Sequence, residues 1–181
     1  MHARWLIPTG ALVGTAVTGT FAQVAYATQY LSVEQAQRAA FPQATEFCVV
    51  DGPDAKVAAS LGGATGWSPR IWQARAADQR QGWLIVDQVL GKSELITYAL
   101  ALDSAGAVLS LEILDYRESH GGEIRMPAWR HQFVGKTAKE SGELTRQIKN
   151  ISGATLSSRH LSEGVQRLLK LYDLALRPAA G

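Results

Sequence analysis

Three β-strands are encoded between Gly82 and Tyr116, in the stretch GWLIVDQVLGKSELITYALALDSAGAVLSLEILDY. Apolar runs cover residues 83–89, 95–103 and 107–116, and the short segments GKS and SAG separate them. Strong strand formers bounded by such turn residues are typical of strands, and short connections join antiparallel neighbours. The stretch therefore predicts an antiparallel meander.

Alternation within these strands predicts which faces are buried, because every second residue of a strand points to the same side. The large apolar residues of the second and third strands fall on one face each: Ile96, Tyr98, Leu100 and Leu102, then Leu109, Leu111 and Ile113. Each strand thus offers one face to a common core.

Helical patterns flank these strands in the sequence. Ser32 is a candidate N-cap for a short helix that stops at Phe41-Pro42. A longer amphipathic helix is predicted from near Ser157 to before Pro178, with one apolar face formed by Leu161, Val165, Leu168, Leu169 and Tyr172. The apolar residues of the segment 51–80 do not recur at a regular spacing, so this segment is interpreted as short strands and loops. The fold class is therefore α+β, an antiparallel sheet packed against N- and C-terminal helices.

Composition excludes several functional classes. A chain of 181 residues suits one core, and a net charge of +2 is too small to indicate nucleic acid as a partner. The single cysteine, Cys48, cannot form an internal disulfide, and no CxxC or CxxCH motif is present to hold zinc, an iron–sulfur cluster or haem. Any redox cofactor must therefore be held in another way, and no metal site or catalytic triad is predicted.

Residues 1–27 have the pattern of a signal peptide. His2 and Arg4 precede a weakly apolar run, and Ala25-Tyr26-Ala27 provides a cleavage site. An uncleaved membrane anchor is the alternative, although Pro8 and several glycines and threonines interrupt the run. We predict a periplasmic or otherwise exported protein whose mature part, residues 28–181, is a single domain.

The segment Ser152-Gly153-Ala154-Thr155-Leu156-Ser157-Ser158 directly precedes the long C-terminal helix. A helix N-terminus presents free N–H groups and a positive dipole end, which favour a phosphate. Gly153 permits a left-handed backbone, Ala154 adds little bulk, and the hydroxyls add donors. Serines before a helix are also common N-caps, so these residues alone leave both interpretations open.

This segment resembles the S/T-G-A-S/T signature of the FMN-binding domain found in the Rnf and Nqr electron-transport complexes and in exported single-domain flavoproteins. The resemblance implies that Thr155 carries FMN through a phosphoester, which a Mg-dependent flavin transferase makes from FAD. It also implies a cofactor site that includes Ser152, Gly153, Ala154, Leu156 and Ser157.

A second block resembles the same family, which often has H-x-E-T-P-G-L-G, then Trp, then Q-F-x-G-K. Here residues 116–123 read YRESHGGE, followed by Trp129 and by QFVGK at 132–136. The resemblance implies that Glu118, His120, Gly121 and Gly122 lie at the flavin. From the residues alone, Glu118 and His120 are equally consistent with solvent exposure, the glycines with a turn, and Trp129 with the core.

Two residues depart from the family pattern. Lys149 stands where relatives usually have Asp, three residues before the signature, and His120 stands where they have Pro. A second Gly-Ala-Thr sequence ends at Thr65, but Gly66-Trp67-Ser68-Pro69 cannot open a helix after it, so no phosphate site is expected there.

These features predict an exported electron carrier with covalent FMN, rather than a stand-alone enzyme. Its expected partners are a flavin transferase for maturation and redox proteins, including membrane cytochrome or iron–sulfur components. The alternative is an exported binding module of the same fold that is never flavinylated, and Lys149 is the residue that favours it.

Overall fold

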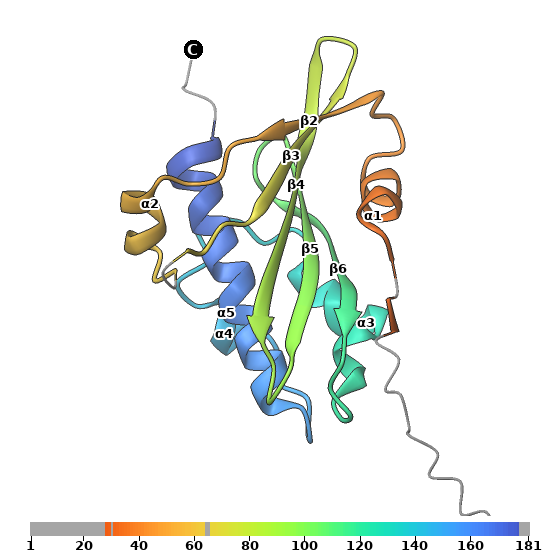
Figure 1. The fold of residues 1–181 in the computed structure, drawn as a ribbon, viewed down its shortest axis with the longest axis vertical. Helices are drawn as coiled ribbons and strands as arrows, with labels where there is room; N and C mark the ends of the chain where they lie inside the picture. The colour runs from red at the N-terminus through yellow and green to blue at the C-terminus, as the bar shows by residue number, and fades with distance from the viewer. Residues whose placement is uncertain (1–27, 30, 64–65, 178–181) are drawn as a thin grey trace, which may run out of the picture.

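An antiparallel sheet forms the centre of the fold (Figure 1). The computed structural model describes residues 28–29, 31–63 and 66–177, and within them six strands occur in the order β1-β6-β5-β4-β3-β2. Their bounds are β1 Thr28–Gln29, β2 Glu46–Val50, β3 Arg70–Ala76, β4 Gln79–Leu90, β5 Leu95–Asp103 and β6 Val108–Tyr116. The predicted meander is confirmed as β4, β5 and β6, which pair antiparallel in sequence order. The signal-peptide prediction for residues 1–27 lies outside the described residues.

Helices cover both faces of the sheet (Figure 1). Their bounds are α1 Val33–Ala40, α2 Ala55–Ser60, η1 Gly122–Arg125, α3 Pro127–Arg130, η2 His131–Phe133, α4 Leu144–Gln147, α5 Thr155–Leu171 and the π-helical η3 Tyr172–Leu176. α1 and its cap Phe41 pack on one face, where Leu84, Val86 and Ala99 are buried. α5 packs on the other face with the predicted apolar residues of that helix. The α+β prediction is confirmed.

The face prediction holds for β5 and fails at one residue of β6. Ile96, Tyr98, Leu100 and Leu102 are all buried beside α5, as expected. In β6, Leu111 and Ile113 join them, but Leu109 is 40% exposed. The cause is a β-bulge: Ala101 pairs with Ser110 whereas Leu102 pairs with Val108, so Leu109 has no partner of its own. Val108 takes the buried place instead.

Residues 51–80 contain more regular structure than the sequence indicated. The loops and the strand β3 agree with the expectation, but residues 55–60 form the helix α2, capped by the Asp54 carboxylate on Val57 N–H at 2.8 Å. No residue of this six-residue helix is buried, so it has no apolar face to produce a helical period.

A buried polar cluster ties α5 to the sheet. The Asp87 carboxylate on β4 accepts hydrogen bonds from the Trp67 indole at 2.8 Å, the Tyr98 hydroxyl at 3.0 Å and the Arg167 guanidinium at 3.1 Å. Arg167 also lies over the Trp67 ring, 5.0 Å from its centroid. Because each donor comes from a different element, the cluster fixes α5 and the segment after α2 against the sheet.

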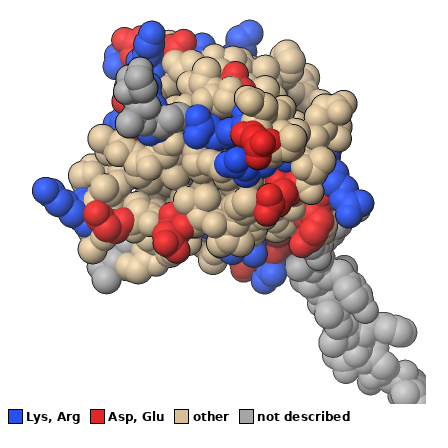
Figure 2. All heavy atoms as spheres, turned by 90° about the horizontal axis from the view of Figure 1, so that it is seen from above, with Lys and Arg blue, Asp and Glu red and all other residues tan. Residues whose placement is uncertain are grey.

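Acidic and basic side chains are interspersed on the face seen in Figure 2. This distribution agrees with the small net charge of +2. No helix in the described part of the chain is long and apolar enough to cross a membrane.

Candidate functional site

A tight turn places the signature directly before α5. The Ala154 N–H donates to the Ile151 carbonyl at 3.0 Å, and Gly153, the third residue of this turn, has a φ of +84°. A positive φ at that position is readily adopted by glycine and strained for other residues, as in type II turns. Ala154 occupies the N-cap position, and no side chain caps the helix there. The first N–H groups of α5 therefore have no side-chain acceptor from the cap.

Thr155 is the first residue of α5 and is exposed. Its hydroxyl donates only a long hydrogen bond, 3.4 Å, to the Ile151 carbonyl. The helix thus begins two residues before the expected start near Ser157. Ser157 and Ser158 are buried and do not cap it. The capping interpretation of these two serines is wrong, because the helix starts before them and both are buried within its first turns.

Side chains from two neighbouring segments hold the residues just before the signature. The peptide group of Lys149 is bound on both sides: its carbonyl accepts from the Trp129 indole at 2.7 Å and its N–H donates to the Gln132 side chain at 2.9 Å. Gln132 in turn donates to the Trp129 carbonyl at 3.1 Å. Trp129 is 7% exposed and packs edge-on against Phe133, so its core interpretation is the correct one.

Trp129→Phe tests this tether, because it removes the indole N–H and keeps an aromatic ring in the core. We expect a loss of stability of about 1 kcal/mol, the usual net value of one hydrogen bond, and a melting temperature lower by about 2–4 °C. Thermal unfolding followed by circular dichroism measures it. Trp83→Phe is the matched control, since the buried Trp83 indole N–H has no hydrogen-bond partner among the described residues. Equal losses in both variants would show that the tether adds nothing.

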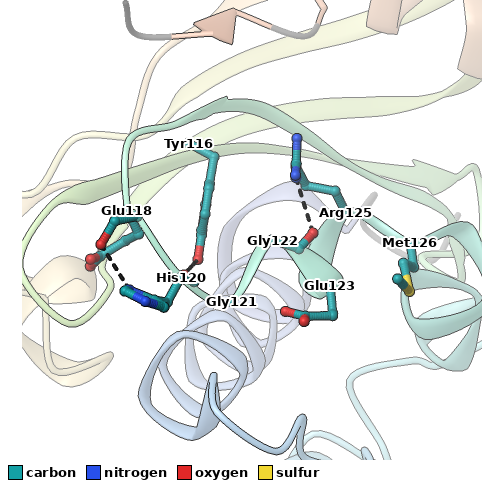
Figure 3. A pocket seen from close by; sticks show the side chains of 9 residues that line it. Tyr116, Glu118, His120, Gly121, Gly122, Glu123, Arg125 and Met126 are labelled. Atoms are coloured by element: carbon teal, nitrogen blue, oxygen red, sulfur yellow. Dashed lines mark hydrogen bonds between the residues drawn. The ribbon is translucent and has the colours of Figure 1, made fainter. Parts of the chain in front are cut away.

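The glycine-containing loop meets the signature directly. Gly121 has a φ of +84°, and a Cβ at this position would lie 2.6 Å from the Ala154 Cβ and 2.9 Å from the Tyr116 hydroxyl. The Tyr116 hydroxyl donates to the His120 carbonyl and so fixes the loop (Figure 3). Burial raises the pKa of Tyr116, an effect that a hydrogen bond with Ser157 opposes. The two sequence motifs are therefore in contact through two small residues.

Glu118 binds backbone groups of the β4–β5 turn. One carboxylate oxygen, Oε1, accepts from the Ser93 N–H at 2.6 Å and from the Glu94 N–H at 3.0 Å. Burial by itself would raise the pKa of Glu118, but these N–H groups, that of Lys92 and the Lys92 charge together hold it below its usual value. Glu118 thus brings the β4–β5 turn to the loop that follows β6.

Two adjoining hollows bring most of the predicted site residues together. One, with a volume of about 510 Å³, is lined by Gly153, Ala154, Thr155, Leu156 and Ser157, by Glu118, Ser119 and His120, and by Lys92 and Ser93. The other, of about 600 Å³, is lined by residues 118–123 together with Tyr116, Arg125 and Met126. Residues 118–120 line both hollows. Of the predicted residues, Ser152 alone lines neither hollow.

Figure 3 shows the second hollow at close range. Tyr116 reaches from the end of β6 to the loop, with Glu118 and His120 on one side of it and Arg125 and Met126 on the other. The His120 ring is hydrogen-bonded to the Ser119 hydroxyl at 2.9 Å. Gly121 and Gly122 belong to this hollow and not to the one around Thr155.

Seven lining residues were not among the predicted site residues: Lys92, Ser93, Tyr116, Ser119, Glu123, Arg125 and Met126. Lys92 and Ser93 appeared only as turn residues between strands, and their link to the site runs through the Glu118 carboxylate. Met126 is 56% exposed and Leu156 47%, so each hollow has an accessible apolar side chain at its wall. An exposed apolar residue in a loop has no sequence signal of its own.

Both hollows have the size of ordinary small-molecule sites, about 300–1,000 Å³. The first combines an uncapped helix N-terminus, a left-handed glycine and an exposed threonine hydroxyl, which fit a phosphate group and the atom that could be esterified to it. Thr65 lies outside the described residues; the described residues after it, 66–69, are not helical and lead into β3.

A comparison with protein families found a match over the part of the chain that forms the two hollows. Residues 91–170 match the family model of the FMN-binding domain. The matched segment begins in the β4–β5 turn and ends in α5, so it contains every residue that lines the two hollows. A search among curated proteins found no match.

Proposed function

We propose that this chain is an electron carrier that holds FMN covalently on Thr155, as phosphothreonyl-FMN, because residues 91–170 match the family model of the FMN-binding domain. The family match supports FMN as the cofactor. The observation that carries the covalent assignment is the position of Thr155, exposed at the uncapped N-terminus of α5 and lining a hollow of about 510 Å³.

The attachment reaction requires FAD and a flavin transferase. The Thr155 hydroxyl oxygen forms a bond to the phosphorus of the FMN half of FAD, the bond from that phosphorus to AMP breaks, and the hydroxyl proton leaves. AMP is released and no electrons are exchanged. N–H groups at a helix N-terminus stabilise a phosphate by about 0.3–1 kcal/mol, or up to about 2 when partly buried. This is too little to retain a diffusible flavin, which is the reason for a covalent bond.

FMN bound there supplies one- and two-electron redox chemistry, and the protein supplies position and electrostatics. His120 lines the hollow that contains Thr155, and Gly121 and Gly122 line the adjoining hollow, so we propose that these residues contact the cofactor. Accessible side chains such as Met126 and Leu156 leave the site open to other proteins. From the resemblance to domains of electron-transport complexes, we propose membrane cytochromes or iron–sulfur proteins as redox partners.

Peptide mapping by mass spectrometry tests the proposal. The full chain is produced together with an active flavin transferase and then digested. We expect the mass of FMN on the peptide that contains Thr155 and on no other peptide. FMN on a peptide containing Thr65, or unlabelled protein beside a transferase that labels another substrate, would contradict the assignment.

One observation favours the rival function, a binding module that never receives flavin. Lys149 replaces the usual acidic residue, and its peptide group is fixed by Trp129 and Gln132, so the charge change lies in a rigid segment close to Thr155. After co-production with a transferase and denaturation, a carrier is yellow whereas the module is colourless.

We further propose that the chain is exported and cleaved after Ala27. This proposal is supported by the sequence pattern of residues 1–27 and by the pairing of Thr28 with Tyr116, which makes residue 28 part of the sheet. N-terminal sequencing of the periplasmic protein is expected to start at Thr28. A chain that still starts at Met1 and sediments with membranes would instead identify an uncleaved anchor.

A further inference from the structure

The β4–β5 turn forms part of the hollow that contains Thr155. Lys92 and Ser93 line this hollow together with the signature residues 153–157, although about sixty residues separate the two segments in the sequence. Lys92 is exposed and stands in the middle of the turn between Leu90 and Leu95.

Glu118 fixes the position of this turn. Its Oε1 atom accepts both the Ser93 N–H and the Glu94 N–H, so the residues after Lys92 are bound to the loop that follows β6. Gly91 leaves space for this contact, because a Cβ at residue 91 would lie 2.5 Å from Glu118 Oε1 and 3.1 Å from the Ile96 side chain. The contact is therefore built into the packing at the base of the turn.

The charged groups of the hollow differ in what they can offer an anion. Glu118 is negative, and its Oε1 is occupied by backbone donors. The His120 ring is bonded to the Ser119 hydroxyl. Lys92 brings a positive charge and three rotatable donors on a flexible stem. Hydrogen bonds from an ammonium group to a phosphate are roughly twice as strong as neutral ones.

We propose that Lys92 binds the phosphate of FMN, and that Glu118 is a positioning residue that holds Lys92 at the site through the β4–β5 turn. This inference rests on the proposed function, and it adds a cationic ligand to the helix N-terminus. Glu118 then acts on the cofactor through the turn rather than by its own contact with the ring.

Binding of free FMN and riboflavin to the full chain, made without a transferase, isolates the phosphate contact because riboflavin lacks that group. Flavin fluorescence titrations give both affinities. We expect the wild-type chain to prefer FMN, and Lys92→Met to weaken FMN binding about 10-fold, the loss expected for one charge-assisted hydrogen bond, with riboflavin binding unchanged. Lys92→Arg should keep most of the preference. Lys56→Met, in α2, makes the same charge change away from the site and should have no effect.

Two substitutions at Glu118 separate charge from position. Glu118→Gln keeps an oxygen that can accept both backbone N–H groups, and it should retain the preference for FMN. Glu118→Ala removes the anchor and should lower FMN affinity about as much as Lys92→Met, without affecting riboflavin. Circular dichroism verifies that each variant is folded.

The experiments that test the role of Lys92 are separate from the experiment that tests the proposed function. A wild-type chain that binds FMN no better than riboflavin, or a Lys92→Met variant with an unchanged ratio of the two affinities, would overturn the role of Lys92. Covalent labelling of Thr155 is measured separately by peptide mapping, so either proposal can fail while the other stands.

Discussion

Thr155→Ala is expected to give a folded, exported protein that carries no covalent flavin. The substitution removes the acceptor oxygen completely, so labelling falls to background rather than by a fraction. Stability should change by no more than about 0.5 kcal/mol, as at most exposed sites, because Thr155 is exposed and its hydroxyl makes only the 3.4 Å bond to Ile151. In-gel flavin fluorescence after denaturation measures the label, and thermal unfolding measures stability.

Two companion variants sharpen this prediction. Thr155→Ser keeps a hydroxyl at the same position and should retain part of the label. Thr65→Ala should retain all of it, because the residues after Thr65 lead into β3 and not into a helix. Covalent flavin on the Thr155→Ala protein would place the attachment on another residue and refute the phosphothreonine assignment.

Gly121→Val is expected to damage both the fold and the attachment site. A left-handed backbone costs a residue with a Cβ about 1–2 kcal/mol, and overpacking costs about 1–3 kcal/mol more, because the new Cβ would lie 2.6 Å from the Ala154 Cβ. We expect a total loss of about 2–5 kcal/mol and a melting temperature lower by roughly 5–20 °C. Labelling of Thr155 should also fall, since Ala154 directly precedes it.

Gly122→Val is the matched control one residue away. The atoms nearest to a Cβ there belong to the end of the flexible Arg125 side chain, and Gly122 does not have a positive φ. We expect its stability to stay within about 1 kcal/mol of the wild type, with labelling preserved. Equal thermal losses in the two variants, measured by calorimetry, would mean that the Gly121–Ala154 contact does not support the signature.

The meander was predictable from its apolar runs and turn residues, and the exceptions have local physical causes. Short turns separate the runs that form β4, β5 and β6, and large apolar residues alternate in β5, so the pairing of the strands and the face of β5 buried beside α5 could be deduced. The exposure of Leu109 could not, because a bulge depends on how two strands meet and not on one strand's pattern. The helix α2 was not predicted, because none of its residues is buried and its sequence therefore has no apolar face.

The candidate site was predictable where its residues lie in continuous motifs. The signature and the loop around His120 were identified from the sequence, and the structure places them side by side. The β4–β5 turn was not identified as part of the site, because Lys92 and Ser93 are linked to it through the Glu118 carboxylate. Trp129 and Gln132 appeared as parts of a motif, whereas their role as tethers of Lys149 needed the fold.

The separation of the site's walls along the chain has a consequence for maturation. The hollow around Thr155 combines the β4–β5 turn, the loop after β6 and the start of α5, so it depends on contacts between residues far apart in sequence. Such long-range contacts form late in folding because closing long loops is entropically costly. We therefore expect a newly made chain to expose the signature before the pocket has formed. Any enzyme that recognises the pocket walls must act on Thr155 after the chain has folded, in whichever compartment folding is completed.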